Sequence, residues 1–312
     1  MKIAQTFSEQ VKDELSRYEY DGTAMKAVLS SFLTNNLSMS ITKDKEVWEV
    51  RTQLNSTIRL IDQFFCQLYD IKRKISYTDV QKINNRRIYK LTLEGNFEQI
   101  NSDLQLNEIY PKQILGNSIN VRAYLAGAFL SGGSINSVEK SNYHLEIRSS
   151  KLQYLRLIQK LLQPFNISIT LLKRKNNYVL YIKKAANVSD FLKIIGANSA
   201  MMQLEEVIIS RDYYNNVQKL NNLDIANLRK SSVAGQTQVM MINRIRKSKL
   251  FKEQPDKFKF YCSLKLQNPE ASLTEMVHIF QKKYQINMTR TGINHYVLKI
   301  KKIFNSNLKT IM

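Results

Sequence analysis

The feature that most constrains the fold is an internal repeat: displaced by 97 residues, the first two hundred residues match themselves without a gap. Four pairs of segments fall into this register: Phe32–Thr34 with Phe129–Ser131, Glu49–Arg51 with Glu146–Arg148, Ile58–Ile61 with Leu155–Ile158, and Phe64–Phe65 with Leu161–Leu162. One such match can arise by chance, whereas four in one register indicate a duplicated structural unit. The chain is 312 residues long, so a further segment follows the two copies.

Both copies show the same alternation of helical and strand patterns. In the first, we expect a helix over 24–36, strands near 37–43 and 47–53, a helix over 55–69, strands near 71–79 and 86–94, and a short helix over 96–104. In the second, we expect a helix over 120–132, strands near 133–137 and 142–149, a helix over 151–163, strands over 167–175 and 177–183, and a helix over 185–195. The helices carry apolar residues three and four positions apart, the spacing of a buried face. The sequence predicts an α+β fold built from a duplicated αββαββα unit.

Two local signals refine the second copy. Asn176-Asn177 suits the tight turn of a β-hairpin. Gly196 suits the left-handed stop of the helix that precedes it.

The stretch YLAGAFLSGGSI, residues 124–135, predicts where the two copies meet. Its small side chains allow two helix backbones to approach closely, so we expect this helix to pack against the equivalent Ala27–Leu33 at a pseudo-two-fold axis. The residues assigned to this helix pair are Leu125, Ala126, Gly127, Phe129 and Gly132. The glycines at 132 and 133 are expected to let the backbone leave the pair at positive φ.

Positive charge is concentrated toward the carboxyl end. The formal net charge is +21, and residues 217–312 carry 18 Lys or Arg against 5 Asp or Glu. A codon bias would spread the charge evenly, so the gradient favours a polyanionic partner, above all nucleic acid. An anionic membrane surface is the weaker alternative, because neither end has a basic amphipathic helix with a bulky apolar face. The sequence shows no signal segment and no membrane-spanning stretch.

The cysteines and histidines suggest no metal or redox site. Cys66 and Cys262 are too few and too far apart for a disulfide framework or a zinc site, and Cys66 is expected to be a small buried apolar residue. The three histidines lack ligand spacing, and His144 is expected to lie in a strand and pair across the sheet. We predict no cofactor, no metal and no catalytic residue, in a cytoplasmic protein associated with the nucleoid.

The last seventy residues carry the pattern of a helix-turn-helix. Asn268-Pro269 ends one helix, because proline cannot continue it. Ser272 then caps the next helix, with Glu275 as its capping-box partner. The predicted elements are helices over 257–267 and 273–283, and a last helix from Thr289 or Thr291 to about residue 304.

The last helix is predicted to contact double-stranded DNA. Residues near the start of a recognition helix face base edges, whereas later lysines contact phosphates. The predicted contacts are Ser272, Thr289, Arg290, Thr291, Asn294, His295, Lys299 and Lys302. A second basic group, Lys173, Arg174 and Lys175, lies at the hairpin of the second copy. It serves either as a solubilising turn or as a phosphate contact.

The duplicated unit resembles the LAGLIDADG homing endonucleases, whose two central helices end in acidic residues that hold divalent metal over DNA. Here the matching positions are Asn35 and Gly132, which cannot supply the charged oxygens that Mg²⁺ prefers. Glu139 and Asp44 lie several residues further on and would reach the site only if their loops folded back. The resemblance implies an inactive scaffold, with a metal-dependent DNA endonuclease as the alternative.

Nearly the whole chain is similar to the WhiA family of bacterial transcription regulators. The similarity is carried by RAYLAGAFLSGGSIN (122–136), YHLEI (143–147), DFLKIIGA (190–197), ANLRK (226–230), NPEASLTEM (268–276) and TRTGINHYVLKI (289–300). The family implies a degenerate homing-endonuclease scaffold joined to a helix-turn-helix, in a regulator linked to cell division and, in relatives that sporulate, to differentiation. RNA polymerase or another regulator would be a further partner. A third hypothesis is an interaction module whose scaffold binds a protein or a small ligand.

These patterns divide the chain into four regions. We expect the first repeat with an amino-terminal helix in 1–118, the second repeat in 119–215, a helical linker in 216–250, and the DNA-binding helix-turn-helix in 251–312. A long helix is expected to start with Asn198 or Ser199 as its cap. The linker either enters the DNA-binding domain or packs back on the repeats.

Overall fold

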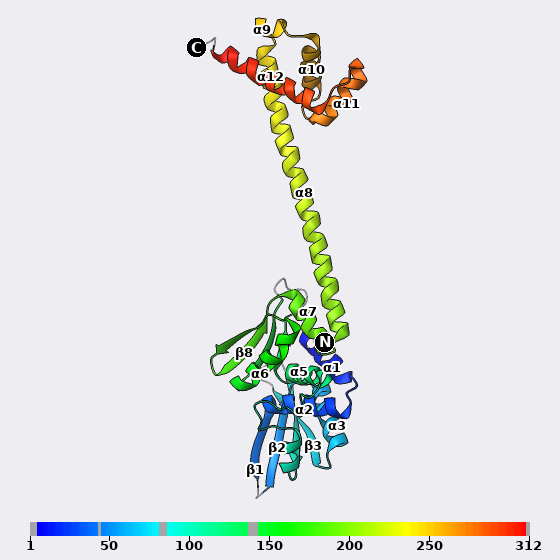
Figure 1. Cartoon of the computed structure of the whole chain (residues 1–312), viewed down its shortest axis with the longest axis vertical. Coiled ribbons are helices and arrows are strands. Elements are labelled where there is room, and N and C mark those ends of the chain that lie inside the picture. Colours follow the sequence, from blue (N-terminus) through cyan, green and yellow to red (C-terminus); the bar gives the residue numbers. More distant parts are fainter. Residues whose placement is uncertain (1–4, 43–44, 81–85, 137–142, 310–312) are drawn as a thin grey trace. The chain divides into compact units, whose positions relative to one another are not determined.

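The computed structural model describes residues 5–42, 45–80, 86–136 and 143–309. The chain forms two compact units, 1–211 and 212–312, and the long helix α8 (Asn198–Ile245) begins in the first unit and ends in the second. Figure 1 shows both units along the chain and labels many of their helices and strands. Asp44 and Glu139, which we considered as displaced metal ligands, lie outside the described residues.

The first unit contains the two predicted copies. The first copy consists of α1 (Phe7–Arg17), α2 (Gly22–Asn36), β1 (Leu37–Thr42), β2 (Lys45–Thr52), α3 (Asn55–Leu68), β3 (Lys72–Val80), β4 (Arg86–Glu94) and α4 (Glu98–Asp103). The second consists of α5 (Ser118–Gly132), β5 (Gly133–Ile135), β6 (Leu145–Ser149), α6 (Leu152–Leu162), β7 (Thr170–Arg174), β8 (Asn177–Ile182) and α7 (Ala185–Ile194). The antiparallel sheets have the equivalent orders β1-β2-β4-β3 and β5-β6-β8-β7. The predicted α+β fold with a duplicated αββαββα unit is confirmed.

One hydrophobic core joins both copies, because each sheet turns one face toward the helices. In α3 the residues Ile58, Ile61 and Phe65 are fully buried, which matches the predicted apolar stripe. Trp48, on β2, is buried and stacks on Phe97 with 4.2 Å between the ring centroids. These contacts fix the sheets against the helices and leave the opposite sheet faces open.

The two copies meet through α2 and α5, as predicted. Leu125, Ala126 and Phe129 are fully buried in this contact region. A Cβ atom added to Gly127 would lie 2.5 Å from the Val28 carbonyl oxygen and 3.0 Å from Ser31 Cβ. Because that space is already filled by the backbone of α2, only glycine fits at this crossing. Gly127 therefore sets the distance between the two helices.

Gly132 and Gly133 do not have the positive φ that we expected. Gly133 has a φ of −76°, and Gly196 is the glycine with positive φ among the described residues, at +86°. The two glycines are needed for space instead: a Cβ on Gly132 would overlap the Arg148 carbonyl oxygen, and one on Gly133 would overlap the Phe129 ring. Close packing at the end of α5, not backbone conformation, explains them.

Two further local predictions are wrong. The hairpin turn is Lys175–Asn176, one residue earlier than Asn176-Asn177, because Arg174 pairs with Asn177 and Lys175 takes a φ of 52°. This register keeps Leu180 in the core, and a slip by one residue would turn it to the other face. Cys66 is exposed, because the buried stripe of α3 passes through its neighbour Phe65.

The start of α8 is not capped by its own residues. The Glu14 carboxylate, from α1, accepts the backbone N–H groups of Ser199 at 2.6 Å and Ala200 at 3.0 Å. A carboxylate suits this position because the helix amino terminus leaves unpaired N–H groups and a partial positive charge. Neither predicted cap, Asn198 or Ser199, is needed.

The second unit is helical. After α8 come α9 (Lys249–Lys252), α10 (Asp256–Gln267), α11 (Leu273–Tyr284) and α12 (Arg290–Lys309). Its own core includes Ile242 of α8, Phe258 and Tyr261 of α10, Phe280 of α11 and Ile300 of α12. None of the helices in the described ranges is long and apolar enough to cross a membrane.

Candidate nucleic-acid interface

The turn between α11 and α12 is built by local signals in the sequence. Ser272 Oγ accepts the backbone N–H of Glu275 at 3.2 Å, and the Glu275 carboxylate accepts the Ser272 N–H at 2.7 Å, so the predicted capping box is present. Gln285 ends α11 in the left-handed conformation. Thr289, one of the two predicted caps, accepts the N–H of Gly292 on its Oγ1 at 3.1 Å and starts α12. Two capped helices therefore form with a short turn between them.

Helix α12 has one buried and one exposed face. Ile293, Val297, Ile300 and Ile303 are buried in the core of the second unit. These residues follow the three-and-four spacing of a buried helix face, and Asn294, His295 and Leu298 between them are exposed. The helix is thereby held by its apolar face and presents a polar one.

Most of the predicted contact residues lie on that exposed face. The exposed ones are Thr289, Arg290, Thr291, Asn294, His295 and Lys302, and Ser272 at the start of α11 is exposed too. Lys299 is only half-buried, with its Nζ atom 5.4 Å from the centroid of the Phe258 ring, so it stands at the edge of the face. Lys301 and Leu298 share the exposed face and were missed. The charge run Lys299–Lys302 contained the signal for Lys301, whereas an apolar residue at position 298 gave none.

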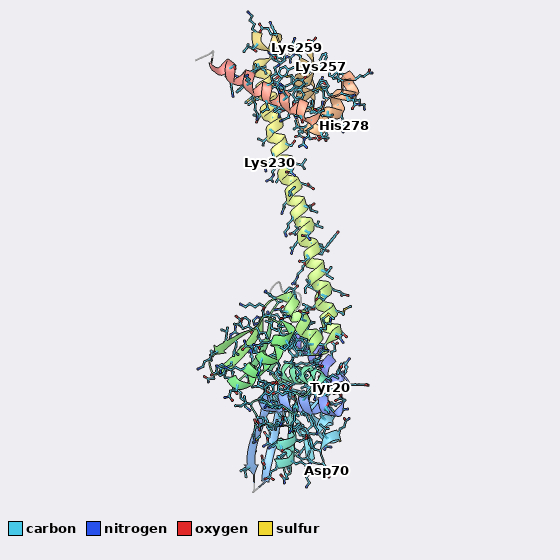
Figure 2. All side chains as sticks on the ribbon, in the orientation of Figure 1. Tyr20, Asp70, Lys230, Lys257, Lys259 and His278 are labelled. Carbon is cyan, nitrogen blue, oxygen red and sulfur yellow. The ribbon has the colours of Figure 1, made fainter. Side chains whose placement is uncertain are left out.

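The basic side chains of the second unit are largely uncompensated. Residues 212–312 contain 18 Lys or Arg and 6 Asp or Glu. In the part of this unit that the structure describes, Lys259 is the one basic side chain in an ion pair with a carboxylate, Asp256 at 3.6 Å. Figure 2 labels Lys257 and Lys259 on α10. The excess charge is therefore free to attract a polyanion.

Basic side chains of the first unit are more often neutralised. Pairs with carboxylates are formed by Lys26, Arg51, Arg73, Arg87, Lys90, Arg148 and Arg174. Residues 1–211 also contain 29 Lys or Arg against 20 Asp or Glu, so the first unit has a smaller positive excess than the second although its chain is longer.

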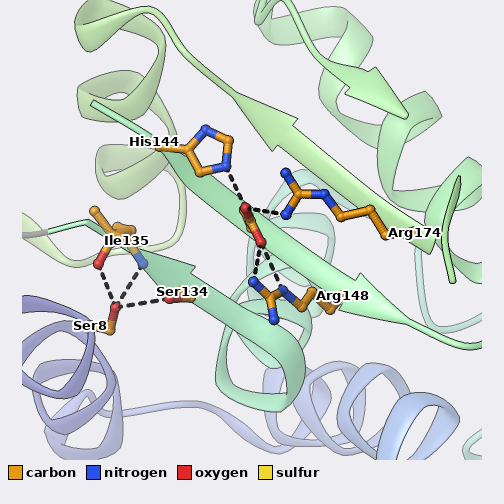
Figure 3. A network of polar contacts seen from close by, with 7 residues as sticks. Ser8, Ser134, Ile135, His144, Arg148 and Arg174 are labelled. Atoms are coloured by element: carbon orange, nitrogen blue, oxygen red, sulfur yellow. Dashed lines mark hydrogen bonds and ion pairs between the residues drawn. The ribbon is translucent and has the colours of Figure 1, made fainter. Parts of the chain in front are cut away.

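The hairpin group Lys173, Arg174 and Lys175 is exposed at the tip of β7. Arg174 reaches back to Glu146 of β6, with 3.3 Å between Nη1 and Oε1. Glu146 also pairs with Arg148 at 2.6 Å and with the His144 Nε2 atom at 2.5 Å (Figure 3). His144 lies one residue before β6 and not within the strand as predicted, but its carbonyl accepts the Asn136 N–H at 3.0 Å, so it pairs across the sheet as expected. One carboxylate thus holds three potentially cationic side chains on one face of the sheet.

The environment of Glu146 keeps it ionised. Its side chain is buried, and burial alone would raise its pKa. Hydrogen bonds from Arg148 and His144 outweigh that effect, and the pKa lies below the ordinary value for glutamate. The network therefore remains a charged one at neutral pH.

The positions that would carry metal-binding acids are occupied by other chemistry. The Asn35 amide Nδ2 donates to Ser131 Oγ at 3.0 Å and to the Arg148 carbonyl at 3.1 Å. The Lys151 ammonium donates to the Thr34 carbonyl at 2.6 Å, so a cation already lies at the end of α2. Among the described residues, no group of three or more His, Cys, Asp or Glu side chains lies close enough to hold a metal ion.

Comparison with known protein families agrees with this architecture. A profile for the WhiA amino-terminal LAGLIDADG-like domain matches residues 23–107, one for the WhiA LAGLIDADG-like domain matches 121–214, and one for the WhiA carboxyl-terminal helix-turn-helix domain matches 217–304. The chain is 31% identical over 301 residues to the probable cell division protein WhiA of Enterococcus faecalis, covering 95% of this chain and 96% of that protein. It is 30% identical over 305 residues to the same-named protein of Lysinibacillus sphaericus, covering 96% of each chain.

Solved structures show the same fold. The crystal structure of full-length WhiA from Thermatoga maritima aligns with a TM-score of 0.60 at 22% identity, covering 96% of this chain and 98% of that chain. A structure of the amino-terminal LAGLIDADG domain of WhiA aligns with a TM-score of 0.51 at 25% identity, covering 63% of this chain and 93% of that chain.

Proposed function

The chain belongs to the WhiA family, and from this premise we propose that it is a transcription regulator that binds double-stranded DNA at specific sequences. The observation that carries the proposal is the exposed polar face of α12, in a unit whose Lys and Arg side chains are nearly all without a carboxylate partner in the described residues. The positive charge of such a unit gives it affinity for any DNA duplex. Side chains that reach base edges let it discriminate between duplex sequences.

We assign the readout of bases to the start of α12. Arg290 and Asn294 are exposed there, and these residue types pair bidentately with guanine and adenine. Lys302 lies farther along the same face and is assigned to phosphate, together with Lys299 at its edge. The hydroxyl groups of Ser272 and Thr289 accept a hydrogen bond within their caps and keep their protons for phosphate oxygens. Thr291 and His295 complete the set between these two groups.

We propose that the duplicated scaffold has no nuclease activity. An amide, a glycine and a lysine ammonium lie where divalent metal would need anionic oxygens. The sheet hairpin with Lys173, Arg174 and Lys175 is then a secondary candidate for DNA contact, since Arg174 is partly neutralised by Glu146.

The remaining assignments extend this proposal. We propose four functional regions, 1–118, 119–215, 216–250 and 251–312, in a cytoplasmic, nucleoid-associated protein that needs no cofactor. The relatives named above are called cell division proteins, which supports a regulatory role in division for this chain. RNA polymerase or another regulator would be its protein partner.

Selection of bound fragments from random duplex DNA by the full-length protein tests the proposal. We expect one enriched sequence, with Asn294→Ala lowering the preference for it by about 1–3 kcal/mol. Lys302→Ala should instead weaken all sequences alike and reduce the salt slope by roughly 0.9, because each phosphate contact releases counterions. Lys219→Ala, an exposed lysine of α8 outside the proposed interface, is the matched control. Loss of specific and non-specific binding in equal measure for both variants, or nicking of plasmid DNA with Mg²⁺, would contradict the proposal.

A further inference from the structure

A groove in the second unit differs in its lining from the rest of that unit. It has a volume of about 1090 Å³ and lies between the carboxyl half of α8, the turn after α10, and α11. His278 of α11, labelled in Figure 2, is one of its lining residues, whereas α12 contributes none. The groove therefore lies outside the proposed base-reading face of α12, while its lining residues Ala271 and Glu275 are close in sequence to the proposed phosphate contact Ser272.

The groove offers large apolar side chains to solvent. Leu228 is 70% exposed and Met240 is 53% exposed, and Val239 and Ile279 also line the groove. Leu228, Val239 and Met240 come from α8, and Ile279 comes from α11. Burial of such side chains by a partner would be favourable, at roughly 25 cal/mol for each Å² of apolar surface removed from water.

The walls of the groove are fixed in place. Gly235 of α8 packs so closely on the Pro269 carbonyl that a Cβ atom would overlap it. Ser231 Oγ and Ser232 Oγ donate to the Glu270 carbonyl at 3.4 Å and to its carboxylate at 3.5 Å. The turn after α10 is thus held against α8, which lowers the ordering cost of binding on this side of the groove.

The charged residues of the lining are acidic. Residues 212–312 contain only 6 Asp or Glu, and two of them, Glu270 and Glu275, line the groove. No Lys or Arg of the described residues lines it, although this unit contains 18 in all. Hydrogen bonds from Ser272 hold the pKa of Glu275 below its usual value, so it is charged at neutral pH. Carboxylates at the groove repel phosphate and attract cations.

We propose that this groove binds an amphipathic helix of a partner protein whose apolar side chains are flanked by Lys or Arg. The apolar lining meets the apolar stripe of such a helix, and Glu270 and Glu275 meet its basic flanks. Leu228 and Met240 are twelve residues apart on α8, a length of about 18 Å that matches about three turns of a bound helix. This helix binding is a second activity in addition to the proposed DNA binding, and it does not depend on DNA.

A display library of helical peptides about four turns long, selected on the full-length protein, tests this proposal. We expect enrichment of peptides with apolar residues at helical spacing and Lys or Arg beside them. In fluorescence anisotropy with an enriched peptide, the double variant Leu228→Gln, Met240→Gln should lower affinity by about tenfold or more. Glu270→Gln should lower it by about threefold at low salt, because one attractive charge is removed. Leu220→Gln, which changes an equally exposed α8 residue outside the groove, should leave it unchanged.

Each alternative occupant has its own signature in these experiments. Enrichment of acidic peptides, equal loss with Leu220→Gln, or no groove-dependent peptide would overturn the proposal. Displacement of the peptide by duplex DNA would assign the groove to nucleic acid. Self-association that the Leu228 and Met240 variant abolishes in sedimentation would assign it to a second copy. The affinity of the same variants for duplex DNA should stay within about twofold of that of the unmodified protein. If neither the unmodified protein nor any variant bound duplex DNA, that result would contradict the proposed DNA binding and leave the proposed peptide binding untouched.

Discussion

At the scale of single residues, Glu146 decides how the basic side chains of the second sheet are presented. Its two carboxylate oxygens are shared among His144, Arg148 and Arg174, so it reduces the net charge of that face while it fixes the arginines. Arg148 and Arg174 are more than half exposed and keep water as a partner, whereas the group at position 146 is buried and depends on the hydrogen bonds within this network. Removing the charge of Glu146 should therefore lower the free energy of unfolding by more than breaking an ion pair on the surface does.

Replacing Glu146 with Gln should lower the free energy of unfolding by about 1–3 kcal/mol at pH 7. Because the folded-state pKa lies below the ordinary value of 4.5, the ionised form contributes stability above that pH, and this is lost as the pH falls through the folded pKa. Urea unfolding at pH 7 and in acid should show the two proteins converging in acid. Glu49→Gln removes a more exposed carboxylate that also pairs with two basic residues, and should cost less than about 1 kcal/mol. Equal losses at the two sites would contradict this account.

At the scale of elements, the helix pair could be predicted because small residues at positions 126–128 leave few alternatives to a close helix contact. The two helices α11 and α12 could also be predicted, since the caps Ser272 and Thr289 and the apolar spacing of α12 are local signals. The start of α8 could not, because its cap comes from Glu14 on another helix. The reason for Gly132 and Gly133 could not be predicted either, because the Arg148 carbonyl and the Phe129 ring come close to them only in the folded chain.

Gly127→Ala should destabilise the first unit, because even one methyl group meets the Val28 carbonyl oxygen at 2.5 Å. We expect a loss of about 1–3 kcal/mol from overpacking. For a unit of this size, each kcal/mol corresponds to a fall of about 2–4 °C in the melting temperature. The matched control is Gly22→Ala at the start of α2, where a Cβ would meet nothing within 4 Å, and its melting temperature should not fall. Similar effects of both substitutions would show that α2 and α5 do not meet through Gly127.

At the scale of the whole molecule, the chain divides its stability between two cores. The core of the first unit runs through both repeats, whereas that of the second joins the end of α8 with α10, α11 and α12, and the two share no residue. Gly127 in the first unit and Gly235 in the second each lie where a Cβ atom would overlap the backbone of another element. These glycines allow each core to be weakened separately.

Calorimetry of the full-length protein should show two transitions that respond to different substitutions. Gly127→Ala should lower the transition of the first unit and leave duplex binding unchanged. Gly235→Ala, whose methyl group would overlap the Pro269 carbonyl, should lower the transition of the second unit and weaken duplex binding. Because the two sites share no core residue, the loss of unfolding free energy in the double variant should equal the sum of the losses in the two single variants within about 0.5 kcal/mol. A shift of both transitions by either single substitution would mean that the units unfold as one, and the polar face of α12 would then depend on packing at the helix pair of the scaffold.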